Sequence, residues 1–320
     1  MDIRRVLGAF ALSWALLPAA HAQEASGDAA CEAAYASLPP GAILDLLEPQ
    51  AATGARAAAL AGYQRLAAEM PHCPEFGYTL GQLYRHGDYL PGNLVAQDIA
   101  KARTLILPMA EAGYLPAYAD LAEMEMRHAQ AREAMKWTQV YLHFVDEVLL
   151  EGVRDGDALQ YQRSAYNGNL LNRVELIWRY TRPTPPRKAV KEDLQAYLAA
   201  HGEAVEARMR ARDRGQGLRA SAQGGGATHA IAPAHSCYVN AIDRIGAGAA
   251  SWIVEVLPSG KPGRVVLENF VPNPDVAGAM RDCLDRYTFA PFAGDAPATI
   301  RVSMVMGSPE GAAISRKRRR

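Results

Sequence analysis

The sequence predicts an α+β protein of two domains, in which an array of helical hairpins precedes a small domain with a sheet. Three observations predict this fold class. Apolar residues recur at helical spacing through residues 31–214. From Trp252 onward the apolar residues gather in short runs that are typical of strands. Between these parts lies a segment, 215–234, whose three consecutive glycines, Gly224 to Gly226, are typical of a flexible linker.

Length and composition fit this division. The chain has 320 residues, enough for two domains, and its 49% hydrophobic and 21% charged residues are typical of a folded protein. The 34 basic residues balance the 34 acidic ones, so the formal net charge is +0. Because no global positive field would attract nucleic acid, we expect no nucleic-acid partner.

The N-terminus has the features of a secretory signal peptide. Arg4 and Arg5 precede an apolar run, Val6–Leu17, and Ala20-His21-Ala22 fits a cleavage site. The run is shorter than the roughly 20 residues that a membrane-spanning helix needs. We therefore expect residues 1–22 to be removed and the protein to be periplasmic, with no transmembrane span in the mature chain. An uncleaved anchor is the alternative.

Export changes the interpretation of the cysteines. The chain has four, Cys31, Cys73, Cys237 and Cys283. An even number in an oxidising compartment indicates disulfides, and four cysteines allow three connectivities. The domain division favours Cys31–Cys73 and Cys237–Cys283, with free buried thiols as the alternative.

The best-defined helical hairpin spans residues 74–113. The first helix shows apolar residues on one face, and its ends are marked by Pro74 and Gly87. Asp98 lies where a carboxylate favours the start of the second helix. Gly113 ends that helix, and Pro116 begins the next. The face of the first helix is formed by Phe76, Leu80, Leu83 and Tyr84.

Further helices are predicted on both sides of this hairpin by the same spacing. They are Ala42–Leu47, Arg56–Met70, Ala131–Glu151, Leu159–Tyr180 and Ala189–Arg214.

The hairpin resembles the Sel1-like family of tetratricopeptide-type repeats. The pattern LGxLYxxG is followed by DxxKA and then by AxAGxxxA, and weaker copies extend the resemblance over Ala57 to Val148. The resemblance implies an α-solenoid that presents a concave protein-binding surface. The signature residues are Leu80, Gly81, Tyr84, Gly87, Lys101, Ala102, Ala110, Gly113 and Ala117.

The C-terminal part reads as two strands, a helix and a closing strand. A turn at Pro258–Gly263 joins Trp252–Leu257 to Arg264–Val271, which predicts a β-hairpin. Pro274 begins a helix with one apolar face, and Ala298–Met306 alternates as the last strand. A helix at Cys237–Arg244 is expected before the sheet, and Tyr287–Phe292 leads into a third strand region. The apolar face of the helix carries Val276, Ala277, Met280, Cys283 and Leu284.

This ββαβ order over residues 235–307 resembles the TonB C-terminal domain family. The resemblance rests on the first-strand apolar run, the Pro-Ser-Gly turn, Arg264-Val265-Val266 and the segment Tyr287-Thr-Phe-Ala-Pro291 that precedes Gly294. It implies a module that binds an extended peptide at a sheet edge. TonB proteins also carry an uncleaved anchor and a long proline-rich spacer, which are not expected here. Peptide binding is therefore favoured over energy coupling.

No catalytic residue, cofactor site or metal site is predicted. The sequence lacks the HExxH, GxSxG, P-loop and GxGxxG motifs. His229, His235 and Cys237 lie close together but lack a fourth ligand at a usable spacing. The C-terminal segment 308–320, which ends in Arg316–Arg320, is expected to be a disordered basic tail, with contact to an anionic membrane surface as the functional alternative.

The sequence therefore favours a non-enzymatic, exported protein-binding or scaffold protein with protein or peptide partners in the cell envelope. A TonB-like accessory of outer-membrane transport that contacts receptors is the first alternative. A hydrolase on the helical scaffold is the second.

Overall fold

The structure, a computed structural model, describes residues 29–149, 173–174, 176–215, 230–231 and 248–306. It is a mixed helical and stranded fold, as predicted. The helices are α2 (Ala42–Leu47), α3 (Thr53–Glu69), α4 (Pro74–His86), α5 (Ile99–Glu111), α6 (Leu115–Arg127), α7 (Ala131–Phe144), α11 (Arg187–Gly215) and α13 (Asp275–Leu284). The strands are β1 (Ala230–Ile231), β2 (Gly248–Val256), β3 (Pro262–Val271), β4 (Thr288–Phe289) and β5 (Ala298–Met306).

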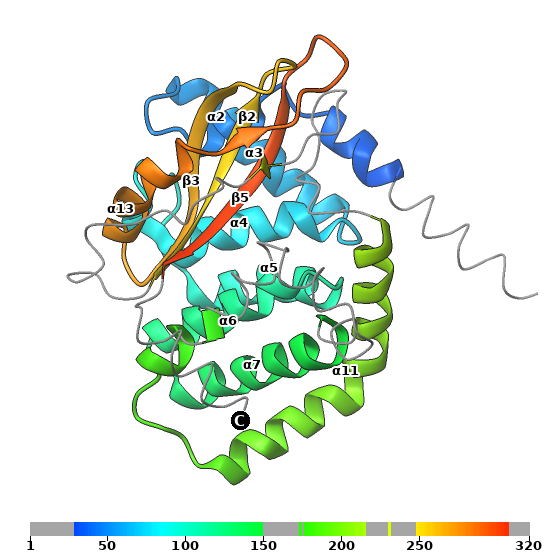
Figure 1. Cartoon of the computed structure of the whole chain (residues 1–320), viewed down its shortest axis with the longest axis vertical. Coiled ribbons are helices and arrows are strands. Elements are labelled where there is room, and N and C mark those ends of the chain that lie inside the picture. The colour runs from blue at the N-terminus through cyan, green and yellow to red at the C-terminus, as the bar shows by residue number, and fades with distance from the viewer. Residues whose placement is uncertain (1–28, 150–172, 175, 216–229, 232–247, 307–320) are drawn as a thin grey trace, which may run out of the picture.

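The helices α4, α5, α6 and α7 stack on one another beneath the sheet (Figure 1). Their ends match the sequence signals. Pro74 occupies the first turn of α4, and Gly87 follows it with a positive φ of 51°. Asp98 caps α5 by accepting a hydrogen bond of 2.9 Å from the Lys101 backbone N–H, and Gly113 follows α5 with a φ of 86°. The predicted hairpin is therefore confirmed from its first residue to its last turn.

Small residues allow α4 and α5 to approach closely. A Cβ added at Gly81 would lie 2.6 Å from the Ile106 side chain and 3.3 Å from the Ala102 carbonyl oxygen. Ala102 is fully buried. Gly81 and Ala102 therefore face one another, and larger side chains at these positions would separate the two helices.

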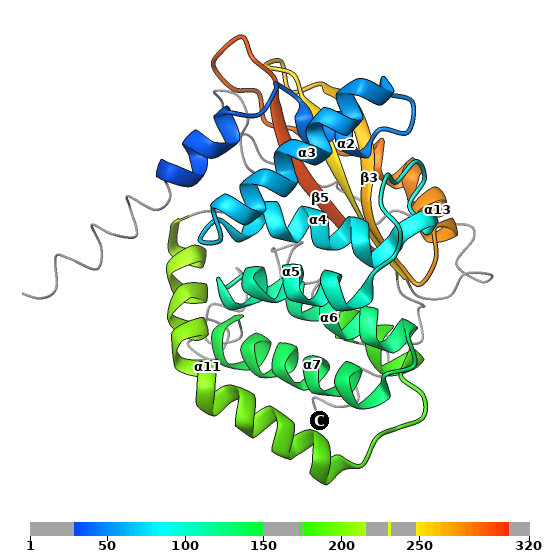
Figure 2. The ribbon, with the colours of Figure 1, turned by 180° about the vertical axis from the view of Figure 1, so that it is seen from behind.

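The long helix α11 runs along one side of the stacked helices (Figures 1 and 2). The hydroxyl groups of Tyr197 on α11 and Tyr118 on α6 lie 2.8 Å apart. Arg208 donates to the backbone carbonyl oxygen of Glu111 at the end of α5, at 2.9 Å. The helix α11 therefore holds the ends of successive helices together.

The larger sheet is antiparallel, with the strand order β3-β2-β5. The turn at residues 257–261 joins β2 to β3, so the predicted hairpin is confirmed. The register shifts between Ser251 and Trp252, so that Glu268 is an extra residue on β3.

Helices cover both faces of this sheet. On one face lie α2, α3 and α4 (Figure 2), and Arg264 of β3 forms an ion pair of 2.6 Å with Asp45 of α2. On the other face lies α13, where a Cβ at Gly248 would come within 2.6 Å of Val276. The five residues predicted to form the apolar face of α13 are buried. Apolar residues of the helical array and of the sheet belong to one continuous core.

Two parts of the sequence prediction differ from the structure or lie outside it. The segment after Tyr287 forms only the short strand β4, which pairs with β1 and not with the larger sheet. Strand β1 itself lies within the predicted linker. Outside the described residues lie the predicted signal peptide, the glycines Gly224 to Gly226, the helix at Cys237–Arg244, the basic tail 308–320 and most of Leu159–Tyr180.

Candidate functional site: a buried charge cluster between the array and the sheet

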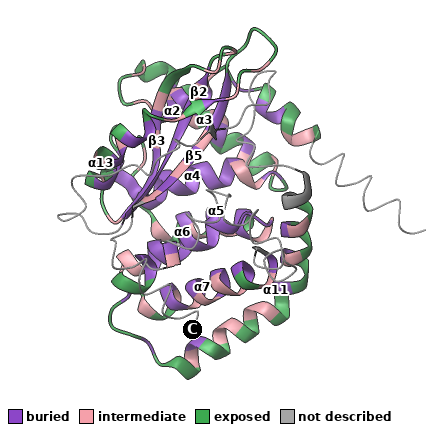
Figure 3. Cartoon of the chain, viewed as in Figure 1, coloured by how far each residue is buried: buried purple, intermediate pink, exposed green. Residues whose placement is uncertain are grey.

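Two carboxylates of α6 face the sheet from the interior of the protein. Asp120 and Glu123 are three residues apart, which places them on the same side of the helix. Neither has any exposed surface (Figure 3 shows α6 as buried along most of its length). They lie at the centre of a polar group that we call the junction cluster. Its members are Tyr78, Gln82, Arg85 and His86 of α4, Asp120 and Glu123 of α6, Arg173, and Asn269 of β3.

Two buried arginines neutralise the two carboxylates. The Arg173 Nη2 atom lies 2.5 Å from Asp120 Oδ1 and 2.7 Å from Glu123 Oε2, and its Nε donates to Glu123 Oε1 at 2.9 Å. Arg85 approaches the same carboxylates at 3.2 and 3.3 Å. The charges are therefore balanced, which the low-dielectric interior requires of buried ions.

Neutral groups complete the hydrogen bonding of Asp120. The Tyr78 hydroxyl donates to Oδ2 at 2.5 Å, and the Gln82 amide donates to the same oxygen at 3.0 Å. The Asn269 amide donates to Oδ1 at 3.0 Å. Burial alone would raise the pKa of the Asp120 carboxyl, but Arg173, Arg85 and the Tyr78 hydroxyl outweigh it and lower the pKa to about 2.

His86 is held neutral beside this carboxylate. Because the Asn269 amide nitrogen faces Asp120, its oxygen accepts the His86 Nε2–H at 2.8 Å. The ring stacks on Phe270, with the centroids 4.2 Å apart. Burial, together with the charge of Arg85, lowers the pKa of His86 well below its ordinary value of 6.5. Its Nδ1 is buried without a hydrogen-bond partner in the described part of the chain.

A second buried ion pair adjoins the junction cluster on the sheet. Arg301 of β5 donates two hydrogen bonds, of 2.5 and 2.7 Å, to Glu268, the extra residue of β3. The Arg301 guanidinium lies 5.2 Å from the centroid of the Tyr78 ring. Tyr78 therefore connects the two groups, with its ring near Arg301 and its hydroxyl on Asp120.

The arrangement fastens the sheet to the helices. Asn269 of β3 bonds to residues of both α4 and α6, and Arg173 adds a third segment of the array. The carboxylate oxygens of Asp120 and Glu123 are occupied by ion pairs and by hydrogen bonds, and they have no exposed surface. In this conformation they are suited to holding the two parts together and not to acting as bases on a substrate.

The junction cluster predicts that the protein loses stability in mild acid. The unfolded chain protonates His86 near its ordinary pKa of 6.5, whereas the folded pKa is lower, so stability is full above pH 6.5 and falls as the pH drops below it. Asp120 adds a second loss, between its ordinary 3.8 and its folded value of about 2. We expect a His86→Gln variant to flatten the dependence between pH 6.5 and 5, by up to about 1.4 kcal/mol per pH unit.

Chemical unfolding at several pH values measures this effect. His72→Gln is the matched control, because His72 is exposed. An unchanged slope in the His86→Gln variant, or an equal change in both variants, would contradict the assignment of a buried neutral imidazole.

No family model, curated protein or solved structure matches this chain. The role of the junction cluster is therefore inferred from its geometry alone.

The nine signature residues predicted from the sequence lie in the array and not in the junction cluster. Tyr84 and Lys101 meet directly, since the Lys101 Nζ donates to the Tyr84 hydroxyl at 2.7 Å and lies 4.0 Å from the ring centroid. Gly81, Ala102, Ala110 and Ala117 are buried, and Gly87 and Gly113 have positive φ. Leu80 is 3% exposed and belongs to the core.

Of the predicted disulfides, Cys31–Cys73 is confirmed. Cys283 is also disulfide-bonded, and Cys237 lies outside the described residues.

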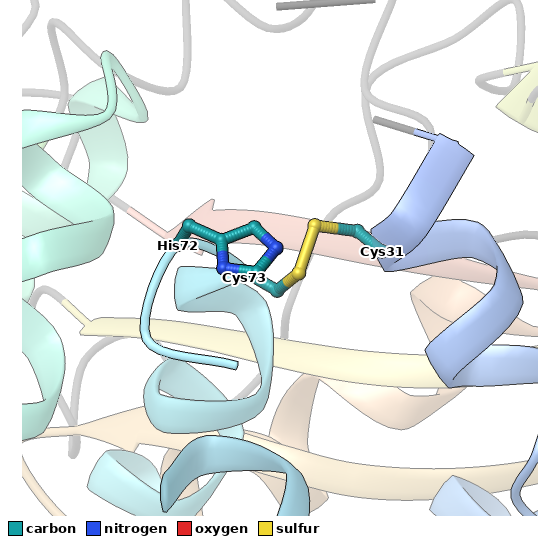
Figure 4. Close-up of side chains that lie close together, drawn as sticks. All are labelled: Cys31, His72 and Cys73. Carbon is teal, nitrogen blue, oxygen red and sulfur yellow. A yellow bond between two sulfur atoms is a disulfide. The ribbon is translucent and has the colours of Figure 1, made fainter. Parts of the chain in front are cut away.

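The exposed ring of His72 lies next to the Cys31–Cys73 disulfide (Figure 4). One nitrogen of His72 and the two sulfur atoms all lie within 4.8 Å of one another. This is close enough for a metal site, but the sulfurs are bonded to each other and provide no thiolate. In the disulfide form the group is therefore a covalent crosslink with a histidine beside it.

The sequence interpretation missed the members of the junction cluster. The available signal was a pair of acidic residues within an apolar helical stripe, since Asp120 and Glu123 flank Leu121 and Ala122, which repeat Leu80 and Gly81. Charged residues on an inward face need partners. The sequence did not indicate which residues those partners would be.

Proposed function

We propose that this chain is an exported, non-enzymatic protein-binding protein in which the helical array supports a small sheet, and the outer edge of β3 receives an extended peptide. The observation that carries the proposal is the position of β3. It is the edge of the larger sheet, and its outer side pairs with no other strand in the described part of the chain. Such an edge presents backbone groups that an added strand can bind.

The accessible part of this edge is short. It lies between Pro262 and Gly263, which begin the strand, and the extra residue Glu268. Val265 and Leu267 are partly exposed along it. The Val265 carbonyl oxygen lies 3.5 Å from Arg281 Nη1, at the limit of a hydrogen bond. Among the described residues, this weak contact is the backbone interaction that an incoming strand would displace.

The helical array is less suited to receiving a partner through α4 and α6. In α4 every residue from Phe76 to His86 is buried, and in α6 every residue from Leu115 to Glu125 is buried. Asn269 of the sheet contacts both helices, and Arg173 contacts α6. The burial of α4 and α6 is consistent with an array that holds the sheet in place, while the sheet provides the binding surface.

One observation supports export. The chain carries a disulfide, Cys31–Cys73, which is typical of oxidising compartments. Among the described helices, none combines the length and the apolarity needed to cross a bilayer.

Photo-crosslinking tests the proposal directly. A photoreactive residue at position 265 should capture an envelope protein in an exporting host, whereas one at Glu203, an exposed position on α11, should not. Because the Val265 carbonyl faces Arg281, its N–H should also point away from β2. Val265→Pro would then remove a donor of the outer edge, keep the pairing with β2 and reduce peptide binding.

The outcomes separate the alternatives. An adduct with an outer-membrane receptor would favour the TonB-like accessory role, and an adduct with another envelope protein would favour the scaffold role. Identical adducts from both positions, no adduct at 265, or full capture by a folded Val265→Pro variant that carries the photoreactive residue at 267 would each contradict peptide binding at β3.

A further inference from the structure

Arg56 of α3 is a buried arginine that has no counterion among the residues described by the structure. Only 8% of its surface is exposed, and its Nε and Nη2 atoms have no hydrogen-bond partner in the described part of the chain. The two other arginines that are buried in the described part of the chain, Arg85 and Arg173, are both paired with carboxylates. A buried charge without a partner is strongly unfavourable. The described residues around Arg56 therefore provide no anion for it.

The guanidinium lies at the N-terminal end of α3. A Cβ added at Gly92 would lie 3.2 Å from Arg56 Nη2 and 2.7 Å from Pro49 Cα. Gly92, in the loop that follows α4, thus lies next to both the guanidinium and Pro49, which precedes α3. Pro91 and Gly92 are exposed, so the site lies directly beneath the surface.

The beginning of α3 carries no negative group of its own. Its N-cap residue, Ala52, provides no side-chain hydrogen bond, and its first turn contains no acidic residue. The N–H groups of the first turn have no acceptor within the helix, and they carry the positive end of the helix dipole. By contrast, α5 is capped by the Asp98 carboxylate.

We propose that Arg56 and the N-terminus of α3 form a binding site for an oxyanion, either a carboxylate or a phosphate group. The guanidinium of Arg56 and the N-terminus of α3 both favour the binding of an oxyanion. The guanidinium fork matches two oxygens of a carboxylate or phosphate, and free N–H groups at a helix N-terminus bind the same groups. The ligand supplies the negative charge that both Arg56 and α3 lack. This site is independent of the β3 edge and goes beyond the proposed peptide-binding function.

Thermal unfolding at constant ionic strength tests the site. The probes are sodium phosphate and sodium acetate, with sodium chloride as the reference salt. We expect phosphate or acetate to raise the Tm of the wild type above its value in chloride, because a ligand that binds only the folded state stabilises it. We expect Arg56→Gln to abolish this rise and Arg65→Gln to keep it, since Arg65 lies on the same helix but is exposed and paired with Glu69.

Further experiments identify the source of the oxyanion and control for misfolding of the variants. A short acetylated peptide with a free C-terminal carboxylate is compared with its amide, which separates a peptide carboxylate from free phosphate. Arg56→Lys keeps the charge but not the fork, and we expect it to bind at least about tenfold more weakly. Amide NMR shifts of Thr53, Gly54 and Ala55 on titration locate the site in the wild type.

Each possible result either supports the oxyanion site or overturns it. An oxyanion-specific rise in Tm that depends on Arg56, with shifts at the start of α3, supports the site. No rise over chloride, an equal rise in Arg56→Gln, or shifts confined to other regions overturns it.

Discussion

Replacing Arg173 with methionine is expected to lower the free energy of unfolding by about 3–5 kcal/mol. The substitution keeps much of the side-chain volume but leaves Asp120 and Glu123 buried with only Arg85 to neutralise them. Burial alone would lower the pKa of the Arg173 guanidinium, but Glu123 and Asp120 raise it well above its ordinary value. Arg173 therefore remains charged in the fold. Urea unfolding, followed by circular dichroism, measures the loss.

A matched variant on the surface separates burial from pairing. Arg132 also forms a two-pronged ion pair, with Asp193 at 2.8 and 2.9 Å, but its side chain is 58% exposed. Arg132→Met should change the unfolding midpoint only slightly, because water solvates the partner that remains. Equal effects of the two substitutions would contradict a structural role for the junction cluster.

A combined variant then tests the cause of the loss. Adding Asp120→Asn and Glu123→Gln to Arg173→Met removes the uncompensated charges, and part of the lost stability should return. A further loss of similar size would instead indicate that hydrogen-bond geometry dominates.

The elements of the array could be predicted from the sequence because their signals are local. Helical spacing defines the buried face of α4, and the capping residues Pro74, Gly87 and Asp98 lie next to the residues whose conformation they set. The same applies to β2, β3 and α13, whose apolar faces follow the strand and helix periods. Local signals do not depend on how distant parts of the chain meet.

The candidate sites were predictable only in part, because most of their contacts are non-local. The pairing of Cys31 with Cys73 followed from an even cysteine count and the domain division. The junction cluster joins Asp120 to Asn269, which are 149 residues apart, and no local pattern specifies that contact. The burial of Arg56 could not be predicted either, because the sequence of α3 does not indicate whether this arginine is buried or exposed.

The packing of the sheet on the array covers two of its helices. Helices α4 and α6 are buried against the rest of the chain. The polar residues on their inner faces, such as Gln82 and Glu123, are those that contact the other parts of the junction cluster. Polar residues on the inner face of a repeat-like helix can thus indicate an intramolecular partner as well as a separate protein.

Replacing both Cys31 and Cys73 with serine is expected to lower the free energy of unfolding by about 4 kcal/mol. The two cysteines are 42 residues apart, and a crosslink over a loop of that length removes a corresponding amount of entropy from the unfolded chain. The disulfide connects the helical residues 29–36 to the start of α4. Chemical unfolding without reductant, so that the disulfide bond of Cys283 stays intact, measures the difference.

Hydrogen exchange distinguishes a global effect from a local one. Tyr35 packs on Phe76 with ring centroids 4.2 Å apart, and this contact remains in the double variant. If the disulfide acts through the unfolded chain, the slowest-exchanging amides of α4 and α6 should lose the same protection as residues 29–36. If only residues 29–36 exchange faster and the unfolding midpoint is unchanged, the crosslink serves to hold the N-terminal segment in place, and the loop-entropy explanation is wrong.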